Sequence, residues 1–373
     1  MDKPEFLYLK LGKGNCLAEY LLGNDNVFKR PTAAIFFGPI TAEEFKHLID
    51  IDRKDNEKKK KEYEQLCKAH EMKDSQRSKR ILTDLKQIAS FFNTRRMTKF
   101  VTITSPYVYI YEPDGPVKTL DDKKLQSKYD KEGIDKLIER ARKGKDKTLE
   151  HNLTEAKISK NGKIEQLPKY MPVKLDAKPF EIKNVPHVLA TLPCNQSFGR
   201  HTCIEIKEED QQGAYWAAKC LLGNQPHISI PNLSDFTPEK FLSLLGQYEL
   251  ETLLFLVLHN KGLFVPSWRG GTLEDVDIIA KNKTDKPINV GDIKFETLET
   301  KTFQVKRGKI RKPINANYIV ALSSQTENNK EKIRDAKWLL ERVEEQQETK
   351  QWLRDLLDWV KNINDFLKPS TGE

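Results

Sequence analysis

The sequence predicts an α+β domain at the N-terminus followed by an α/β domain, in a chain of 373 residues. In the first part, short apolar runs typical of strands surround a charged helical stretch. Later in the chain, "LETLLFLVLHN" is apolar nearly all round, as a helix buried on most sides is. Strand candidates and two closing helices follow it. A helix, several strands and then helices predict an α/β sheet covered on both faces.

The N-terminal α+β domain is expected to span residues 1–112 and to be completed by residues 171–230. The first of these ranges holds the runs "FLYLKLG", "TAAIFFG" and "KFVTITSPYVYIYEP", and the second holds "HVLATLPC" and "HTCIEI". Residues 113–170 open with turn residues and continue as a Lys-rich tract with few apolar side chains. We interpret this tract as a charged linker or an insertion.

The α/β domain is expected to occupy residues 235–373. Thr237 and Pro238 are a typical pair at the start of a helix, one as the N-cap and the other as the first helical residue. The strand candidates are "GLFVPS", "EDVDIIA", "INVGDIKFE", "TKTFQVKR" and "NYIVALSS". Apolar residues at helical spacing predict the last two helices; they are Ile333, Ala336, Leu340 and Val343, then Trp352, Leu356, Val360 and Ile363.

Composition and charge narrow the classes of function. The net charge of +9 favours a polyanion partner, nucleic acid above all. The chain has no window of 18 or more apolar residues, which argues against a membrane span, and its first residues lack the apolar core of a signal peptide. Five scattered cysteines suit a reducing compartment better than a disulfide framework. We therefore expect a cytoplasmic protein.

Two further motifs are better explained by ordinary structural roles. "LGKGN" fails the dinucleotide fingerprint and is typical of a tight turn, and no Walker-type phosphate loop occurs. The spacing of Cys194, His201 and Cys203 matches no common zinc pattern, and Cys203 lies in a β-branched run where an apolar core thiol is usual. Nucleotide-driven chemistry and a zinc site are both disfavoured.

An aromatic strand in the N-terminal part leaves two interpretations open. In "SPYVYIYEP", Tyr107, Tyr109 and Tyr111 lie on one face of the predicted strand. Such a face could stack on exposed bases of a nucleic acid. Alternatively, a neighbouring helix covers the tyrosine face and makes it part of the core.

Several signals agree in the C-terminal part. Glu251 lies on the buried helix, and Asp277 lies in a strand that carries a carboxylate into an apolar setting. Gln304 and Lys306 are two residues apart, so a strand points both to one face. A buried carboxylate costs several kcal/mol unless a cation or hydrogen-bond donors pair with it. A divalent cation would satisfy Asp277, the Gln304 side-chain oxygen and the Val305 carbonyl together, and oxygen ligands suit Mg²⁺.

This ordered set resembles the Mrr-type branch of the PD-(D/E)XK nucleases. A helix glutamate, a glycine at the helix end, "DIIA" and then Q-x-K carry the resemblance, which covers residues 236–323. That branch has Gln where most relatives have Asp or Glu. The resemblance implies a mixed central sheet and Mg²⁺-dependent cleavage of DNA that leaves 5′-phosphates, with Mn²⁺ as a substitute cation. In this interpretation Asp277 and Gln304 hold the metal, Lys306 orients the attacking water or stabilises the developing charge, and Glu251 binds that water or a second metal.

Two departures from the family pattern concern the metal site. Asp275 and Val276 stand where glycines usually precede the aspartate. Asp277 and Gln304 are 27 residues apart, which implies a long hairpin over "KNKTDKPINVGDIKFETLET". An additional acid could enter the site, and Asp275 or Asp292 are the candidates.

The expected partner is double-stranded DNA. The segment "KTFQVKRGKIRK" has six positive charges and no acid, and its residues beyond the catalytic lysine are expected to contact phosphates: Arg307, Lys309, Arg311 and Lys312. "LKLGKGN", "FFNTRRMTKFVTIT" and "FGRHTCIEI" resemble modules that precede Mrr-type domains in modification-dependent (type IV) restriction enzymes, which implies a reader of modified cytosine. A flipped base would then stack on aromatic residues, for which the candidates are Tyr107, Tyr109, Phe198 and Trp216.

Other functions and assemblies remain open at this stage. Cutting both strands would favour a homodimer, with the apolar stripes of the last two helices as the contact, although those stripes could simply cover the sheet. The chain could also be a nucleic-acid-binding protein on a nuclease fold that no longer cuts. A third possibility is a structure-specific nuclease or an RNase of the same fold.

Overall fold

The computed structural model of this chain covers two regions rich in regular structure and several short pieces between them. It describes residues 5–11, 15, 17–23, 30–36, 42–51, 55–69, 89–92, 94, 97–119, 135–136, 138–140, 142–143, 150, 168–194, 198, 202–225, 227–229, 236–268, 276–307, 314–322, 330–363 and 367.

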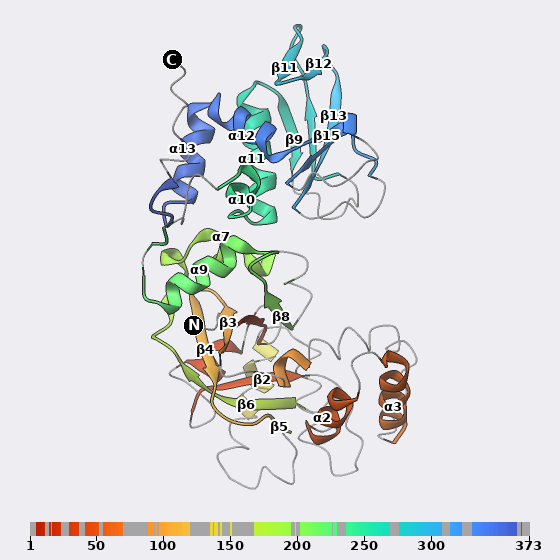
Figure 1. The fold of residues 1–373 in the computed structure, drawn as a ribbon, viewed down its shortest axis with the longest axis vertical. Coiled ribbons are helices and arrows are strands. Elements are labelled where there is room, and N and C mark those ends of the chain that lie inside the picture. The colour runs from red at the N-terminus through yellow and green to blue at the C-terminus, as the bar shows by residue number, and fades with distance from the viewer. Residues whose placement is uncertain are drawn as a thin grey trace. The chain divides into compact units, whose positions relative to one another are not determined.

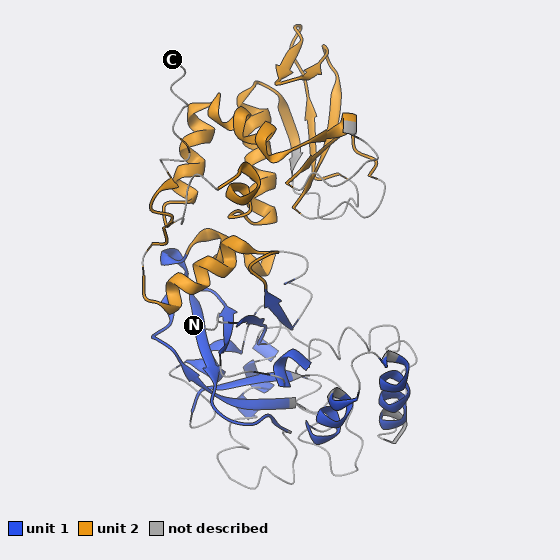
Figure 2. Cartoon of the chain, viewed as in Figure 1, with its two compact units in different colours: residues 1–185, 197–206 blue, residues 186–196, 207–373 orange. Residues whose placement is uncertain are grey.

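The chain divides into two compact units, coloured separately in Figure 2. Unit 1 comprises Met1–Val185 and Ser197–Ile206, and unit 2 comprises Pro186–Gln196 and Lys207–Glu373. Residues 171–230, expected to complete the N-terminal domain, are therefore shared between the two units. Their strands belong to unit 1, whereas the helical residues around 190 and from 212 onward belong to unit 2.

Unit 1 is built on an eight-stranded sheet with the path β2-β6-β4-β3-β1-β8, to which β5 adds beside β6 and β7 beside β4 (Figure 1). Strands β1 and β3 are parallel, and the pairs β1–β8, β3–β4, β4–β6 and β2–β6 are antiparallel. The strands are β1 Glu5–Leu9, β2 Thr32–Phe36, β3 Thr98–Ile103, β4 Tyr107–Pro113, β5 Lys118–Thr119, β6 Pro168–Leu175, β7 Phe180–Glu181 and β8 Cys203–Ile206. The helices are α1 Ala18–Leu22, α2 Ala42–Asp50 and α3 Asn56–Ala69, with the 3-10 turn η3 at Ile182–Asn184.

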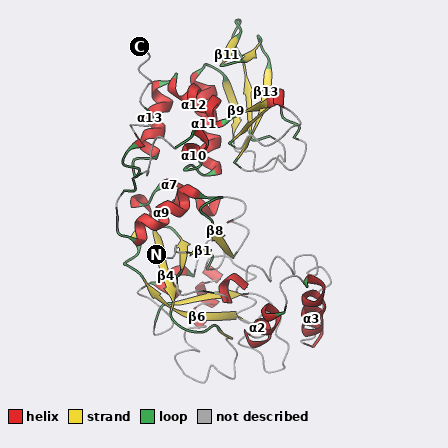
Figure 3. Ribbon diagram, in the orientation of Figure 1, coloured by secondary structure: helices red, strands yellow, loops and turns green. Residues whose placement is uncertain are grey.

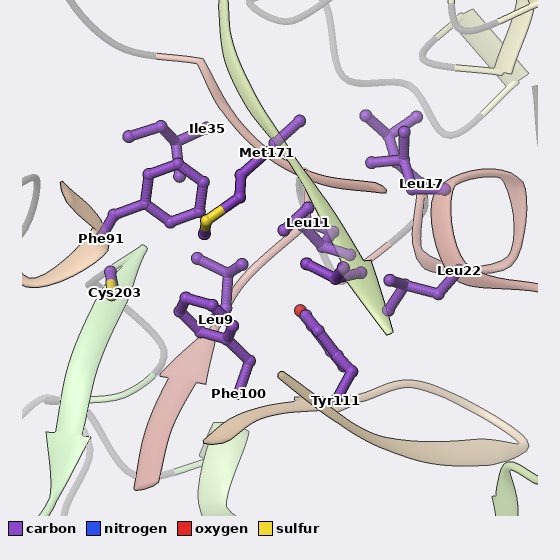
Figure 4. Close-up of a cluster of buried hydrophobic side chains, with 14 of the residues drawn as sticks. Leu9, Leu11, Leu17, Leu22, Ile35, Phe91, Phe100, Tyr111, Met171 and Cys203 are labelled. Atoms are coloured by element: carbon purple, nitrogen blue, oxygen red, sulfur yellow. The ribbon is translucent and has the colours of Figure 1, made fainter. Parts of the chain in front are cut away.

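One apolar cluster holds this sheet together. Side chains from β1, β2, β3, β4, β6 and β8 meet those of α1 and α2 in it, and Figure 4 shows Tyr111, Phe100 and Met171 converging there. Burying each large apolar side chain contributes about 1.5–3 kcal/mol. The predicted N-terminal strands are therefore present because both of their faces have apolar surface to bury.

Unit 2 contains a five-stranded mixed sheet with the order β15-β14-β13-β10-β9. Strand β13 runs parallel to β14 and antiparallel to β10. The strands are β9 Phe264–Trp268, β10 Ile278–Lys281, β13 Thr300–Lys306, β14 Tyr318–Ala321 and β15 Ile333–Arg334, with β11 Ile288–Val290 and β12 Ile293–Phe295 as a separate hairpin. The helices are α7 His187–Ala190, α9 Gln212–Leu222, α10 Pro238–Leu242, α11 Gln247–Asn260, α12 Ala336–Glu344 and α13 Gln347–Leu356, with 3-10 turns η4 Leu192–Cys194 and η6 Lys330–Lys332.

Helices α10 to α13 form one layer beside this sheet (Figure 3). Helix α11 contacts β9, β10 and β13, helix α12 contacts β14, and the two helices contact each other. In the described part of the chain, then, these helices lie on the same face, which differs from the predicted coverage of both faces. The reason is that α11 is buried around most of its circumference, so that α12 and α13 pack on it as well.

Local signals in unit 2 are confirmed in part: Ile333, predicted in a helix, lies in β15, and Val360 lies beyond the end of α13. The Thr237 hydroxyl accepts a hydrogen bond from the Lys240 amide at the start of α10, and Pro238 is its first residue. The long segment between Asp277 and Gln304 forms the β11–β12 hairpin, whose turn includes Gly291 at φ +60°. The fold is thus a mixed α/β arrangement with a mixed multi-stranded sheet. No helix within the described ranges combines the length and the apolar character that crossing a membrane requires.

Candidate active site at the end of β13

The carboxylate of Asp277 lies beside Val305, near the C-terminal end of β13. Asp277 directly precedes β10, and its amide donates to the Phe303 carbonyl at 2.9 Å. The antiparallel register begins at the next pair, Ile278 with Phe303. Further along β13, the amide of Val305 has a side-chain partner and not a main-chain one: it donates to Asp277 Oδ2 at 2.7 Å.

Glu251 is linked to the same residue, Val305, through a glutamine. Gln247 Nε2 donates to the Val305 carbonyl at 3.0 Å and to Glu251 Oε1 at 2.9 Å. Both residues lie in α11, four positions apart, so their side chains share one face of the helix. The main chain of Val305 therefore connects two carboxylates: its amide binds Asp277 directly, and its carbonyl is joined to Glu251 through Gln247.

Gln304 and Lys306 lie on either side of Val305 in β13. Gln304 is buried and lies opposite Ile319 of β14 in the parallel register. Lys306 is the last residue of the strand and is partly exposed, and its carbonyl accepts from the Leu322 amide at 3.0 Å. Because the two residues are two apart, the strand directs their side chains to one face. The four predicted catalytic residues thus come from one helix and two neighbouring strands.

The electrostatics of Asp277 suit a cation. Burial raises the pKa of the Asp277 carboxyl above its ordinary value, and the bond from Val305 and the charge of Lys306 oppose this shift. A desolvated carboxylate is costly, and a bound cation would reduce that cost. Among the described residues, no group of three His, Cys, Asp or Glu side chains could hold a metal. The predicted ligands are two carboxylates, an amide oxygen and a main-chain carbonyl, and an all-oxygen set of this kind suits Mg²⁺ better than Zn²⁺.

Of the predicted phosphate contacts, only Arg307 lies within the described residues. Its Nη2 donates to the Ser243 carbonyl at 3.0 Å, and burial lowers the pKa of its guanidinium, which the nearby Glu249 and Asp210 partly restore. Arg307 is partly exposed, and its guanidinium links the end of β13 to the segment before α11. Lys309, Arg311 and Lys312 lie outside the described residues.

A pocket with both apolar and polar walls borders the site on the side of Arg307. Its wall is formed by Val188, Thr191, Leu192, Gln211, Ala214, Gly246, Gln247, Tyr248, Glu249 and Arg307. In this pocket Glu249 Oε1 lies 2.8 Å from His187 Nδ1 and accepts from Thr191 Oγ1 at 2.6 Å. Burial works to raise the pKa of Glu249, but the bonds from His187 and Thr191 bring it below its ordinary value.

Gly246 explains how the buried carboxylate of Glu249 fits. A Cβ added at Gly246 would collide with Glu249 Oε2. The glycine therefore lets the Glu249 side chain fold back over the N-terminus of α11, where a negative charge is favourable.

Sequence reasoning missed Gln247, Glu249, His187 and Thr191. The i, i+4 spacing of Gln247 and Glu251 on one helix was the signal that could have identified Gln247. His187 and Thr191 are about 60 residues from Glu249 in the sequence, so only the fold brings them to it.

The N-terminal aromatic residues need a further correction. Tyr109 is 2% exposed and belongs to the core cluster of unit 1, and Phe198 is fully buried with its ring edge against Tyr8. Neither ring has a free face on which a base could stack. Tyr107 is partly buried against the same cluster, and Trp216, in unit 2, stacks on Phe236 and donates to Glu208.

The remaining candidates occupy other environments. Asp292 is exposed in the turn between β11 and β12, where it accepts from Trp338 Nε1 at 2.9 Å and pairs with Arg334 at 2.7 Å. These bonds hold its carboxylate at α12 and β15, not at the Val305 peptide. Asp275 and His201 lie outside the described residues. Cys203 is buried in the core, and burial raises its pKa to about 12, as an unreactive core thiol requires.

Comparison of the chain with models of protein families, with characterised proteins and with solved structures found no match.

Proposed function

We propose that this protein is a Mg²⁺-dependent DNA endonuclease of the PD-(D/E)XK type. The observation that supports it best is the set of hydrogen bonds made by the main chain of Val305 in β13. Asp277 binds the Val305 amide, and Gln247 joins the Val305 carbonyl to Glu251. Lys306 follows at the end of the same strand, close enough for its charge to act on Asp277. Two carboxylates and a lysine at a strand end are the groups that metal-assisted phosphodiester hydrolysis needs.

Each residue has a distinct role in this proposal. Asp277, the Gln304 side-chain oxygen and the Val305 carbonyl would hold Mg²⁺, with Mn²⁺ as a substitute. When bound, the cation would supply charge to polarise the scissile phosphate and to acidify a water. Lys306 would orient the attacking water or stabilise charge on the phosphorane, and Glu251 would bind that water. Because Gln304 is neutral, we expect weaker metal binding than in an all-acidic site.

The proposed substrate is double-stranded DNA, with modified cytosine as the mark that is read. The net charge of +9 favours DNA, and Lys309, Arg311 and Lys312 remain the proposed phosphate contacts. Arg307, partly exposed at the pocket, also holds β13 to the segment that leads into α11. Unit 1 remains the proposed reader, but of its aromatic candidates only Tyr107 retains exposed surface. A homodimer would allow both strands to be cut.

The decisive experiment is digestion of supercoiled plasmid, with and without cytosine modification, in Mg²⁺ and in EDTA. Wild-type protein is expected to cut the plasmid in Mg²⁺ but not in EDTA. The cleavage rate of Lys306→Ala is expected to be lower by about 10²–10³-fold. Lys301→Ala is the matched control, because Lys301 lies on the same strand and pairs with Glu299.

Two results would change the assignment. If wild type and Lys306→Ala bind DNA equally and neither cuts any plasmid, the protein is a nucleic-acid-binding protein on a nuclease fold. Cleavage confined to branched DNA or RNA in a parallel panel would assign a structure-specific nuclease or an RNase.

A further inference from the structure

Gln247 occupies an unusual position in the proposed site. Its amide nitrogen lies between two oxygen atoms, 2.9 Å from Glu251 Oε1 and 3.0 Å from the Val305 carbonyl. A carbonyl can only accept a hydrogen bond, and so can an ionised carboxylate, so the Gln247 amide must present its NH₂ group to both. The amide therefore binds the lone pairs that a cation would also use.

We infer that Gln247 is a positioning residue that holds Glu251 and the Val305 carbonyl in the metal-free protein and competes with the divalent cation for them. The inference rests on the proposed function, because the cation site is part of that proposal. It goes beyond that proposal, because the catalytic roles of Glu251, Asp277 and Lys306 do not require Gln247 to compete with the cation.

Two features of the site support competition over simple packing. First, hydrogen bonds that involve a charged group are worth about 1.5–3 kcal/mol, so breaking the contact with Glu251 lowers apparent metal affinity measurably. Second, Val305 is buried and its amide is already bound to Asp277, so its carbonyl position is set by the strand. The cation would meet a preformed carbonyl whose hydrogen bond must first be released.

The neighbouring pocket holds a third carboxylate close to the site. Gln247 forms part of the pocket wall together with Glu249. Glu249 is 1% exposed, and its Oε2 has no hydrogen-bond partner among the described residues. A buried carboxylate oxygen in this condition favours a donor.

The test is direct binding of Mg²⁺ and Mn²⁺ to the full chain, measured by calorimetry without DNA. Gln247→Ala is expected to bind Mg²⁺ about tenfold more tightly than wild type, because no donor has to be displaced. Asp277→Ala is expected to abolish binding. The matched control is Gln351→Ala, which removes an exposed Gln-to-Asp355 bond of the same i, i+4 type on α13. Its Mg²⁺ affinity should equal that of wild type.

A second variant keeps the test informative if Gln247→Ala folds poorly. Gln247→Glu places a third acceptor between the two oxygens, so its melting temperature without metal should fall below that of wild type. Its increase in melting temperature on adding Mg²⁺ should exceed that of wild type.

The possible failures are distinguishable. If wild type binds Mg²⁺ through Asp277 but Gln247→Ala binds equally or more weakly, competition by Gln247 is wrong and the metal site stands. If none of these proteins binds Mg²⁺ or Mn²⁺, the proposed metal-dependent function fails, and the role of Gln247 fails with it.

Discussion

Strands β4 of unit 1 and β13 of unit 2 both suggest function by their alternation, yet their surroundings differ. In β4, Tyr109 and Tyr111 on one face and Val108 and Ile110 on the other are all buried. The Tyr111 hydroxyl lies 2.8 Å from Thr102 Oγ1, within the same sheet. In β13, by contrast, the side chains that bind the Val305 main chain come from other elements. The carbonyl accepts from Gln247 of α11, and the amide donates to Asp277, which directly precedes β10.

The difference lies in how each strand's polar atoms are satisfied. A strand that is buried on both faces needs only apolar neighbours and, for its tyrosines, one local hydrogen bond from a hydroxyl. Such a strand stabilises the fold. Carboxylates placed beside a strand's main chain are costly, and packing does not account for them. A regular aromatic alternation is therefore weak evidence for a site, whereas charged groups that converge from several elements are stronger evidence.

The largest expected effect is on catalysis. Asp277→Ala should reduce Mg²⁺-dependent plasmid cleavage by more than about 10³-fold, because it removes the charged metal ligand. Initial rates on plasmid measure this effect, and the circular dichroism spectrum should stay that of wild type. Unchanged activity would show that the site on β13 is wrongly assigned.

The next effect tests the structural role of β4. Tyr109→Ala should lower the free energy of unfolding of unit 1 by about 3 kcal/mol or more, because it leaves a cavity in the core cluster. Urea unfolding measures the loss, with Tyr107→Ala, a partly exposed neighbour, as the milder comparison. A stable Tyr109→Ala protein with weakened binding to modified DNA would restore the base-stacking role.

A third effect concerns pH. Lys169 of β6 is fully buried beside the Phe45 ring, and burial lowers its pKa to about 7. Between this pKa and the ordinary lysine value, the unfolded chain binds more protons than the folded chain, so stability should rise with pH. The slope is at most about 1.4 kcal/mol per pH unit. Urea unfolding from pH 7 to 9 should show the slope in wild type and lose it in Lys169→Met; equal slopes would contradict the burial of this ammonium group.

The smallest effect is the loss of one hydroxyl. Thr102 Oγ1 donates to the Leu9 carbonyl at 2.7 Å, so the Tyr111 hydroxyl must donate to Thr102. Tyr111→Phe should therefore cost about 1 kcal/mol in the free energy of unfolding, with plasmid cleavage unchanged. A change in cleavage without a change in stability would move this strand from the core to the site.

Much of unit 2 was predictable because its signals are local. The helix over residues 250–260, the strands around Asp277 and Gln304 and the cap at Thr237 each depend on apolar spacing or on one capping residue. The same reasoning placed Gln304 and Lys306 on one strand face. It did not identify Glu249, whose partners His187 and Thr191 come from a segment expected in the other domain.

The amino-acid sequence was sufficient for the mixed α/β character of the chain and for the positions of most strands, because hydrophobic periodicity acts over a few residues. Tertiary structure alone decided that Tyr109 and Phe198 are core residues, that Arg307 donates to the Ser243 carbonyl, and that Gln247 lies between Glu251 and Val305. Those outcomes depend on which elements pack together. Periodicity tells which face of an element is apolar, but not which neighbour covers that face.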